Sequence, residues 1–151
     1  VVWSSVMQLM GIPIKITSMK KFMKKSRNIL GLGTDIIEIE RIRQSIDNHG
    51  YRLISRIFTL KEQDYCLKYQ DPIPHFAARF SAKEAIVKAL GTGFTEHITW
   101  QDIEIINDAS GKPVVYFSKK LQERTNGTYM LLSISHCKLY ATATAIWSYD
   151  S

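Results

Sequence analysis

Two acidic residues far apart in the sequence could together hold a divalent cation. Asp35 follows a glycine-rich turn in GLGTDIIEIERIR, and Glu84 lies in RFSAKEAIVKALG. A Mg²⁺ ion bound to phosphates needs only one or two protein carboxylates, because water and phosphate oxygens complete its coordination. Such a pair would stabilise the charge that develops as a phosphoryl bond breaks. On local grounds, a role for Asp35 in capping the helix expected from Glu38 onward is equally consistent.

Three cationic side chains accompany Glu84 at helical spacing. Intervals of four, one and four residues separate Arg79, Lys83, Glu84 and Lys88, so the pattern predicts that all four lie along one side of a helix. An ordinary solvent-facing helix could show the same spacing. The rest of the segment is rich in Ala and Phe, which favours a cluster of cations for the oxygens of a phosphate-rich ligand.

Other polar residues give weaker signals. His136 ends the segment SISH, where it could donate a hydrogen bond to a phosphate, although a lone histidine is more often structural. GTGF at 91–94 could surround a phosphate with backbone N–H groups, but it matches neither the P-loop nor GxGxxG. No role is assigned to the remaining histidines, His49, His75 and His97.

The elements expected to position these residues change from helices to strands along the chain. Apolar residues at helical spacing dominate the first part, and alternating segments separated by glycine turns dominate the second. The expected helices occupy 38–50, 53–58, 59–69, 75–91 and 118–124. Gly50 is expected to cap the first of them, and Thr59 and Glu62 are expected to form a capping box that opens the third. The expected strands occupy 28–37, 100–108, 113–117, 129–136 and 139–147, and 100–108 and 113–117 are expected to pair as a hairpin around a glycine turn. This order predicts an α+β fold, with helices packed on a small antiparallel sheet.

The excess of positive charge is confined to the beginning of the chain. The 151 residues carry a net charge of +6, with 20 basic and 14 acidic residues, and six of the basic residues lie in 1–30, which contains no acid. The remaining 14 basic residues (20 minus 6) balance the 14 acidic ones. A nucleic-acid-binding domain should carry its charge on the fold itself, so no nucleic-acid partner is expected.

The first 28 residues are expected to be a basic extension outside the fold, which leaves one domain at 29–151. Their positive charges follow an apolar stretch, the reverse of the order in a secretory signal. No apolar run approaches the roughly 20 residues that cross a bilayer, so no membrane partner is expected. Cys66 and Cys137 lack CxxC spacing and are expected to be packing residues, which fits a reducing, cytoplasmic compartment.

Four blocks in a fixed order resemble the holo-[acyl-carrier-protein] synthases, the small single-lobe type of the phosphopantetheinyl transferase superfamily. The blocks are GLGTDIIEIERI, RFSAKEAIVKALGTGF, DIEIINDASGKPVV and SISHCKLYATATAI, and the similarity covers 29–147. The resemblance implies the phosphopantetheinyl transferase fold with one lobe per chain. It also implies transfer of phosphopantetheine from coenzyme A to a serine of apo acyl carrier protein in fatty acid biosynthesis, with release of adenosine 3',5'-bisphosphate. Because one lobe forms only half of a cleft, the resemblance further implies a homotrimer with sites between subunits.

The family pattern also implies roles for individual residues. Asp35 and Glu84 match the metal ligands, so Mg²⁺ is the expected cofactor. Lys83 and Lys88 would contact the pyrophosphate of coenzyme A, and Lys88 would stabilise the transition state. A metal-bound water or Glu84 could accept the proton of the serine. The other expected contacts are Arg79 and His136 with the ribose phosphate, Gly91 and Pro113 in the nucleotide pocket, and Arg41 and Arg43 with the acidic helix of the carrier protein.

Two other functions would explain part of the sequence. A coenzyme A or nucleotide-binding module without transfer activity would use the cations but would not need both Asp35 and Glu84. A small basic RNA-associated protein would lose its binding when residues 1–30 are removed. A transferase would keep its activity after the same truncation.

Overall fold

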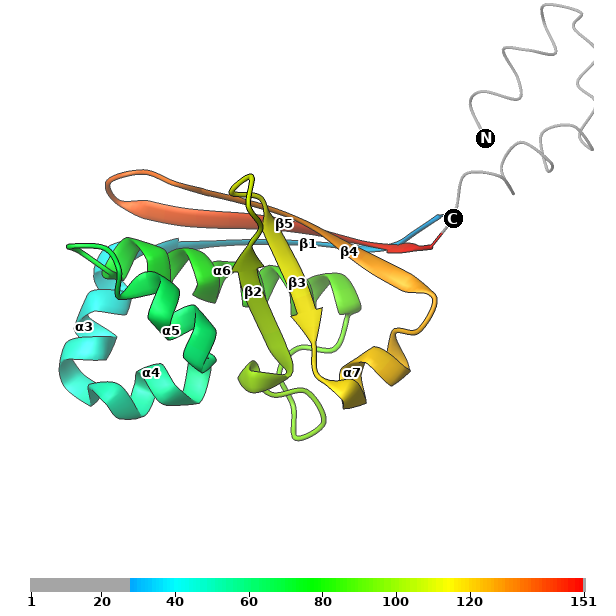
Figure 1. Cartoon of the computed structure of the whole chain (residues 1–151), viewed down its shortest axis with the longest axis horizontal. Helices are drawn as coiled ribbons and strands as arrows, with labels where there is room; N and C mark the ends of the chain where they lie inside the picture. Colours follow the sequence, from blue (N-terminus) through cyan, green and yellow to red (C-terminus); the bar gives the residue numbers. More distant parts are fainter. Residues whose placement is uncertain (1–27, 151) are drawn as a thin grey trace, which may run out of the picture.

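The computed structural model describes residues 28–150 and shows one layer of helices against one face of a three-stranded sheet (Figure 1). The strands β1 (Ile29–Glu38), β5 (Tyr140–Tyr149) and β4 (Thr128–His136) lie in that order and are antiparallel. The first and last strands of the described chain, β1 and β5, are therefore neighbours in the sheet. The predicted α+β fold is confirmed, whereas the predicted extension at 1–28 lies outside the described residues except for Asn28.

The helices follow the sequence pattern closely. Gly50 ends α3 with a φ of 57°, and Thr59 opens α5 with the predicted capping box. The longest helix, α6, begins earlier than expected, because prolines are tolerated in the first turn of a helix. The helices are α3 (Ile39–His49), α4 (Tyr51–Ile57), α5 (Leu60–Cys66), α6 (Ile73–Leu90) and α7 (Lys119–Arg124).

The predicted hairpin forms a separate two-stranded sheet, β2 (Ile103–Asn107) with β3 (Pro113–Phe117). The first of these strands is shorter than expected. Residues 100–102 instead form a 3₁₀ turn, in which Asp102 completes a capping box with Thr99. In Figure 1 the hairpin crosses in front of α6, and its strand β3 contacts β4 of the three-stranded sheet.

The core surrounds α6 and is divided into two clusters of buried side chains. One lies between α6, the large sheet and the hairpin, and the other lies between α6 and the helices α3–α5. Cys66 is buried there, as expected for a packing residue. Cys137 is exposed, so the expectation that it is also a packing residue is wrong.

Two glycines bring β1 unusually close to α6. A Cβ atom on Gly31 would collide with the main-chain carbonyl oxygen of Ala89, and one on Gly33 would collide with that of Ala85. The strand can therefore lie directly on the helix backbone only with glycine at these positions. This contact fixes the position of Asp35 relative to α6.

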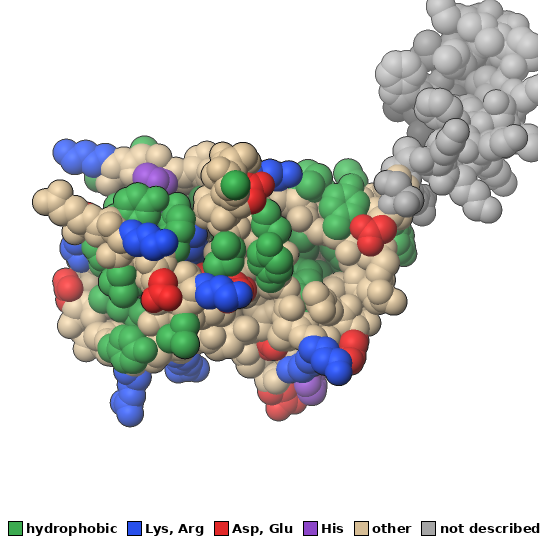
Figure 2. Space-filling view, viewed as in Figure 1, with side chains coloured by type: hydrophobic (Ala, Val, Ile, Leu, Met, Phe, Trp, Pro, Cys, Tyr) green, Lys and Arg blue, Asp and Glu red, His purple; other side chains and the backbone are tan. Residues whose placement is uncertain are grey.

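No helix within residues 28–150 combines the length and the apolar character needed to cross a bilayer. Basic and acidic side chains are interspersed over the face of the molecule shown in Figure 2, without a continuous basic stripe.

Candidate active site

Asp35, Lys88 and Glu84 form a small charged cluster where β1 runs along α6. The Nζ atom of Lys88 lies 2.8 Å from Oδ1 of Asp35 and also donates to the carbonyl oxygen of Thr34 at 3.1 Å. The main-chain carbonyl of Asp35 accepts a hydrogen bond of 3.1 Å from the hydroxyl of Ser81. Asp35 is thus held by both its side chain and its main chain.

The alternative role of Asp35 as a helix cap is wrong. The N-cap residue of α3 is Glu38, and no side chain caps that helix. Asp35 lies inside β1, opposite Ala143 of β5. Its carboxylate is therefore available for a ligand.

Glu84 lies in surroundings that disfavour the charged form of its carboxylate. Burial raises the pKa of Glu84, the charge of Asp35 raises it further, and Lys88 opposes both effects. Two carboxylates thus share one ammonium group, and a divalent cation would relieve this excess of negative charge. No group of three or more candidate metal ligands occurs among residues 28–150. Two carboxylates suit a cation such as Mg²⁺, which takes further ligands from water and phosphate.

Arg79 belongs to a second cluster, on the side of α6 that faces α5 and the hairpin. Its side chain is nearly buried, with 3% exposed. Its Nη2 atom donates to Oδ1 of Asn107 at 2.9 Å, and its guanidinium carbon lies 3.8 Å from the centre of the Tyr65 ring. Its Nε atom is buried and has no hydrogen-bond partner among the described residues.

Two histidines complete the second cluster, and only one of them was predicted. The rings of His136 and His75 are 5.8 Å apart between centroids, and His75 stacks on Tyr69 at 3.5 Å. Burial lowers the pKa of His75, and the charges of His136 and Arg79 lower it further. His75 precedes Arg79 by four residues on α6, a spacing that could have identified it from the sequence.

Lys83 is placed in the interior, apart from both clusters. It is fully buried, and its Nζ atom lies 2.8 Å from each of three acceptors, the carbonyl oxygens of Ile57 and Trp100 and the carboxylate of Glu62. Burial lowers the pKa of Lys83, and Glu62 opposes this effect. An ammonium group has three protons, so a phosphate could be bound only by breaking one of these contacts.

The prediction that four charged residues share one side of α6 is therefore wrong. Arg79 and Lys83 face the buried side, whereas Glu84 is half-buried and Lys88 is exposed. Successive residues of an α-helix differ in direction by about 100°, and the single step from 83 to 84 separates the two pairs.

The other predicted site residues lie at the ends of elements or on the surface. Gly91 ends α6 in the left-handed conformation with a φ of 70°, and Pro113 is paired with Asn107, the residue that binds Arg79. Arg41 is exposed. Arg43 lies 2.8 Å from Asp71 and 3.4 Å from Glu40, so its charge is already compensated.

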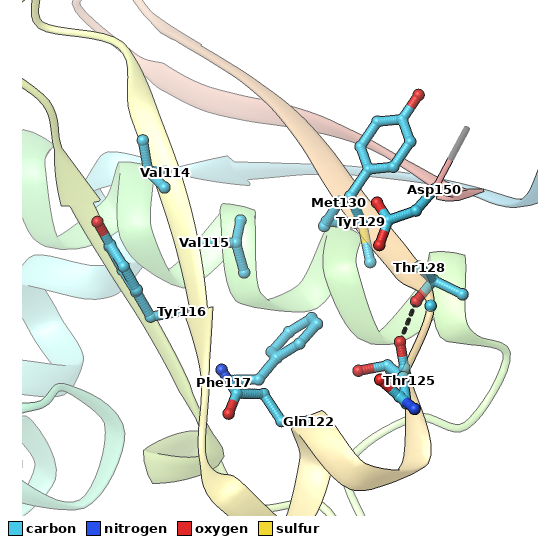
Figure 3. Close-up of a pocket in the computed structure, with 12 residues that line it drawn as sticks. Val114, Val115, Tyr116, Phe117, Gln122, Thr125, Thr128, Tyr129, Met130 and Asp150 are labelled. Atoms are coloured by element: carbon cyan, nitrogen blue, oxygen red, sulfur yellow. Dashed lines mark hydrogen bonds between the residues drawn. The ribbon is translucent and has the colours of Figure 1, made fainter.

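A hollow on the described surface contains none of the predicted site residues. It has a volume of about 490 Å³ and lies between β3, α7 and the beginning of β4. Figure 3 shows that Val115, Phe117 and Tyr129 contribute to its walls, with Asp150 at one side. The charged clusters therefore lie outside this hollow.

The family model, the similar sequences and the similar structures all indicate the same family. Residues 31–145 match the family model described as the 4'-phosphopantetheinyl transferase superfamily. The holo-[acyl-carrier-protein] synthases of Protochlamydia amoebophila and Chlamydia pneumoniae are 56% and 53% identical to the chain. These alignments cover 79% and 78% of the chain, and 98% and 96% of the relatives.

Solved structures of the same family share the fold. A holo-[acyl-carrier-protein] synthase from Neisseria meningitidis has a TM-score of 0.74 at 32% identity, covering 80% of this chain and 98% of that one. The Bacillus anthracis synthase, solved in complex with CoA (3',5'-ADP), has a TM-score of 0.70 at 35% identity, covering 81% and 98%. The chain belongs to the 4'-phosphopantetheinyl transferase superfamily and, within it, to the holo-[acyl-carrier-protein] synthases.

Proposed function

We propose that this chain transfers phosphopantetheine from coenzyme A to a serine of apo acyl carrier protein, in fatty acid biosynthesis. The hydroxyl oxygen of the serine attacks the β-phosphate of coenzyme A, and adenosine 3',5'-bisphosphate leaves. The observation that carries the proposal is the grouping of Asp35, Glu84 and Lys88 where β1 runs along α6. It occurs in a chain that aligns with nearly the whole length of the holo-[acyl-carrier-protein] synthases it matches.

We propose Asp35 and Glu84 as the ligands of a Mg²⁺ ion. The ion, when bound, would neutralise charge on the pyrophosphate and so favour departure of the leaving group. Lys88 is well suited to the developing charge, because its side chain is 49% exposed and its ammonium group is already held beside Asp35. Glu84 is also proposed to accept the proton of the serine hydroxyl.

The second cluster is proposed to bind the nucleotide end of coenzyme A. Arg79 offers a buried, unpartnered Nε atom, and His136 belongs to the same cluster through its contact with His75, which suits the ribose phosphate. Pro113 lies next to this cluster through its pairing with Asn107, and Gly91 would line the nucleotide pocket from the end of α6. Because the donors of Lys83 are all used, we assign Lys83 to the positioning of α6 rather than to the pyrophosphate.

A homotrimer would explain two features of the lone chain. No hydrogen bond or ion pair between described residues joins the cluster at Asp35 to the cluster at Arg79. The outer face of the large sheet is also apolar: Leu32, Ile146 and Leu131 are neighbours across β1, β5 and β4, and Leu32 is 64% exposed. Neighbouring subunits could cover this face and bring complementary clusters together, which sedimentation equilibrium would test.

The carrier protein is proposed to dock beside α3. Arg41 forms no ion pair with any residue of 28–150 and can attract an acidic partner, whereas Arg43 already contacts Asp71. We place the reaction in the cytoplasm, because the exposed free thiol of Cys137 suits a reducing compartment.

The activity is tested directly by the intact mass of apo acyl carrier protein after incubation with this protein, coenzyme A and Mg²⁺. We expect a gain of one phosphopantetheine, and no gain with EDTA or with Asp35→Ala or Glu84→Ala. A folded protein that binds coenzyme A without modifying a competent carrier would instead be a binding module. A chain lacking residues 1–27 should keep its activity, whereas an RNA-associated protein would lose RNA binding.

A further inference from the structure

His75 lies at the centre of the second cluster without a role in the proposed reaction. It occupies the first turn of α6, on the side that carries Arg79 one turn later. Its ring is held against Tyr69 at an interplanar angle of 19° and meets the ring of His136 nearly edge-on, at 73°. Its position is therefore fixed from α5 and its C-terminal turn on one side and from β4 on the other.

The groups around His75 leave it in a positive environment. Arg79 supplies a permanent charge from α6, and His136 supplies a second imidazole from β4. The nearest carboxylate, Asp71, is already bound to Arg43 of α3 at 2.8 Å and to the main-chain N–H of Ile73.

The remaining titratable neighbours are uncharged near neutral pH. The pKa of the Cys66 thiol is raised to about 12, chiefly by burial, and that of the Tyr69 hydroxyl is raised by its hydrogen bond with Tyr65. Asn107, from β2, is neutral. The second cluster thus contains one arginine and two histidines but no carboxylate that is free to pair with them. The buried Nε atom of Arg79 also lacks an acceptor. A doubly charged anion would satisfy all of them.

We propose that His75 is a third ligand, beside Arg79 and His136, for the phosphate monoester on the ribose of coenzyme A, and that it takes up a proton when this dianion binds. The inference rests on the proposed function, which supplies the ligand. It adds a pH-dependent preference for 3'-phosphorylated nucleotides over those with a free 3'-hydroxyl.

The direction of the pH dependence follows from linkage. Without ligand, burial and the neighbouring cations lower the pKa of His75, so the imidazole is neutral around pH 7. A bound dianion has the opposite effect and raises this pKa. Between the two values, binding takes up a proton, so the affinity falls up to about tenfold for each unit of rising pH. Measurements should start at pH 6.5, because the second ionisation of a phosphate monoester lies near pH 6.

Isothermal titration of the full chain with adenosine 3',5'-bisphosphate and with adenosine 5'-phosphate tests the inference. Wild type and His75→Phe are compared at pH 6.5 and 8.0, in two buffers of different ionisation enthalpy. Phenylalanine can keep the ring stacked on Tyr69 but cannot be protonated. A parallel His136→Gln variant separates the proton taken up by the second imidazole.

We expect the preference of the wild type for the bisphosphate to fall severalfold from pH 6.5 to 8.0, with proton uptake at the lower pH. His75→Phe should bind the bisphosphate about five- to tenfold more weakly at pH 6.5, bind the monophosphate as before, and lose the uptake that His75 contributes. Unchanged preference and uptake, or equal weakening for both nucleotides, would overturn the inference.

Transfer to apo acyl carrier protein, measured on the same samples, separates this inference from the proposed function. If the wild type transfers phosphopantetheine while His75→Phe retains the full preference for the bisphosphate, only the role of His75 fails. If the wild type neither transfers phosphopantetheine nor binds the bisphosphate, the proposed function fails and the inference fails with it.

Discussion

Replacement of Lys83 by methionine distinguishes a structural lysine from a phosphate ligand. The change removes the counterion of Glu62 at a site where both side chains are fully buried, and it also leaves the carbonyl oxygens of Ile57 and Trp100 without their donor. Removing one partner of a buried ion pair costs about 3–5 kcal/mol in the free energy of unfolding. Because small domains are stable by about 5–15 kcal/mol, Lys83→Met should lose much of its stability.

Urea unfolding followed by circular dichroism measures this loss. The double variant Glu62→Gln/Lys83→Met should regain part of it, since no uncompensated charge remains buried. The matched control is Lys88→Met, the same chemical change on the same helix at an exposed position. That variant should lose no more than about 1 kcal/mol of stability, while its transfer rate falls on the order of 10²–10³-fold.

The opposite pattern would refute this reasoning. If Lys83→Met unfolds within about 1 kcal/mol of the wild type and its KM for coenzyme A rises more than about tenfold, Lys83 binds the pyrophosphate, as the family resemblance implied. The three hydrogen bonds of its ammonium group would then have to be replaced in the ligand complex.

Three further predictions concern the contact of β1 with α6, the carboxylate pair and the docking surface. Gly33→Ala places a Cβ atom against the carbonyl oxygen of Ala85. This variant should lose about 1–3 kcal/mol in the free energy of unfolding, measured in urea, and should also lose activity. An unchanged urea unfolding curve would contradict the close contact. The pKa of Glu84 is raised in the folded state, so between the two pKa values the folded state holds a proton that the unfolded chain has released. In EDTA, the melting temperature should therefore fall as pH rises from the ordinary pKa of glutamate to the pKa of Glu84 in the folded state. Glu84→Gln should remove this part of the pH profile, and a variant with the same profile as the wild type would refute the prediction. Arg41→Glu should raise the KM for the carrier protein several-fold at low salt and leave the KM for coenzyme A unchanged. The increase in KM should disappear as salt is added, because salt screens the charges. An increase that does not depend on salt would argue against electrostatic docking.

Local patterns in the sequence predicted most of the secondary structure, because each depends on neighbouring residues. The capping box of Thr59 and Glu62 and the turn at Gly50 are examples, and both are present. The pairing of β1 with β5 depends on residues at opposite ends of the described chain, and no local pattern encodes it. The 3₁₀ turn before β2 was missed, although Thr99 and Asp102 carry a capping signal.

The chemistry expected of the site was easier to infer from the sequence than its geometry. Asp35 and Glu84 could be paired because phosphate-bound Mg²⁺ calls for few carboxylates, and the structure does bring them together. Lys83 was misplaced because charge alone does not tell whether a helical lysine faces solvent or a buried acid. Its partner, Glu62, looked like part of a capping box, which it also is: it accepts from the N–H groups of Thr59 and Ile105.

The division of charged residues over α6 would allow one helix to contact both ends of coenzyme A, as we propose. Glu84 and Lys88 face β1, whereas Arg79 faces α5 and the hairpin, and Lys83 fixes the orientation of the helix between them through Glu62. The buried ion pair of Lys83 with Glu62 and the close contacts of β1 with α6 at Gly31 and Gly33 resist rotation of the helix. In the proposed coenzyme A site, a rotated α6 would misplace the groups expected at both ends of the ligand, because both clusters include residues of this helix.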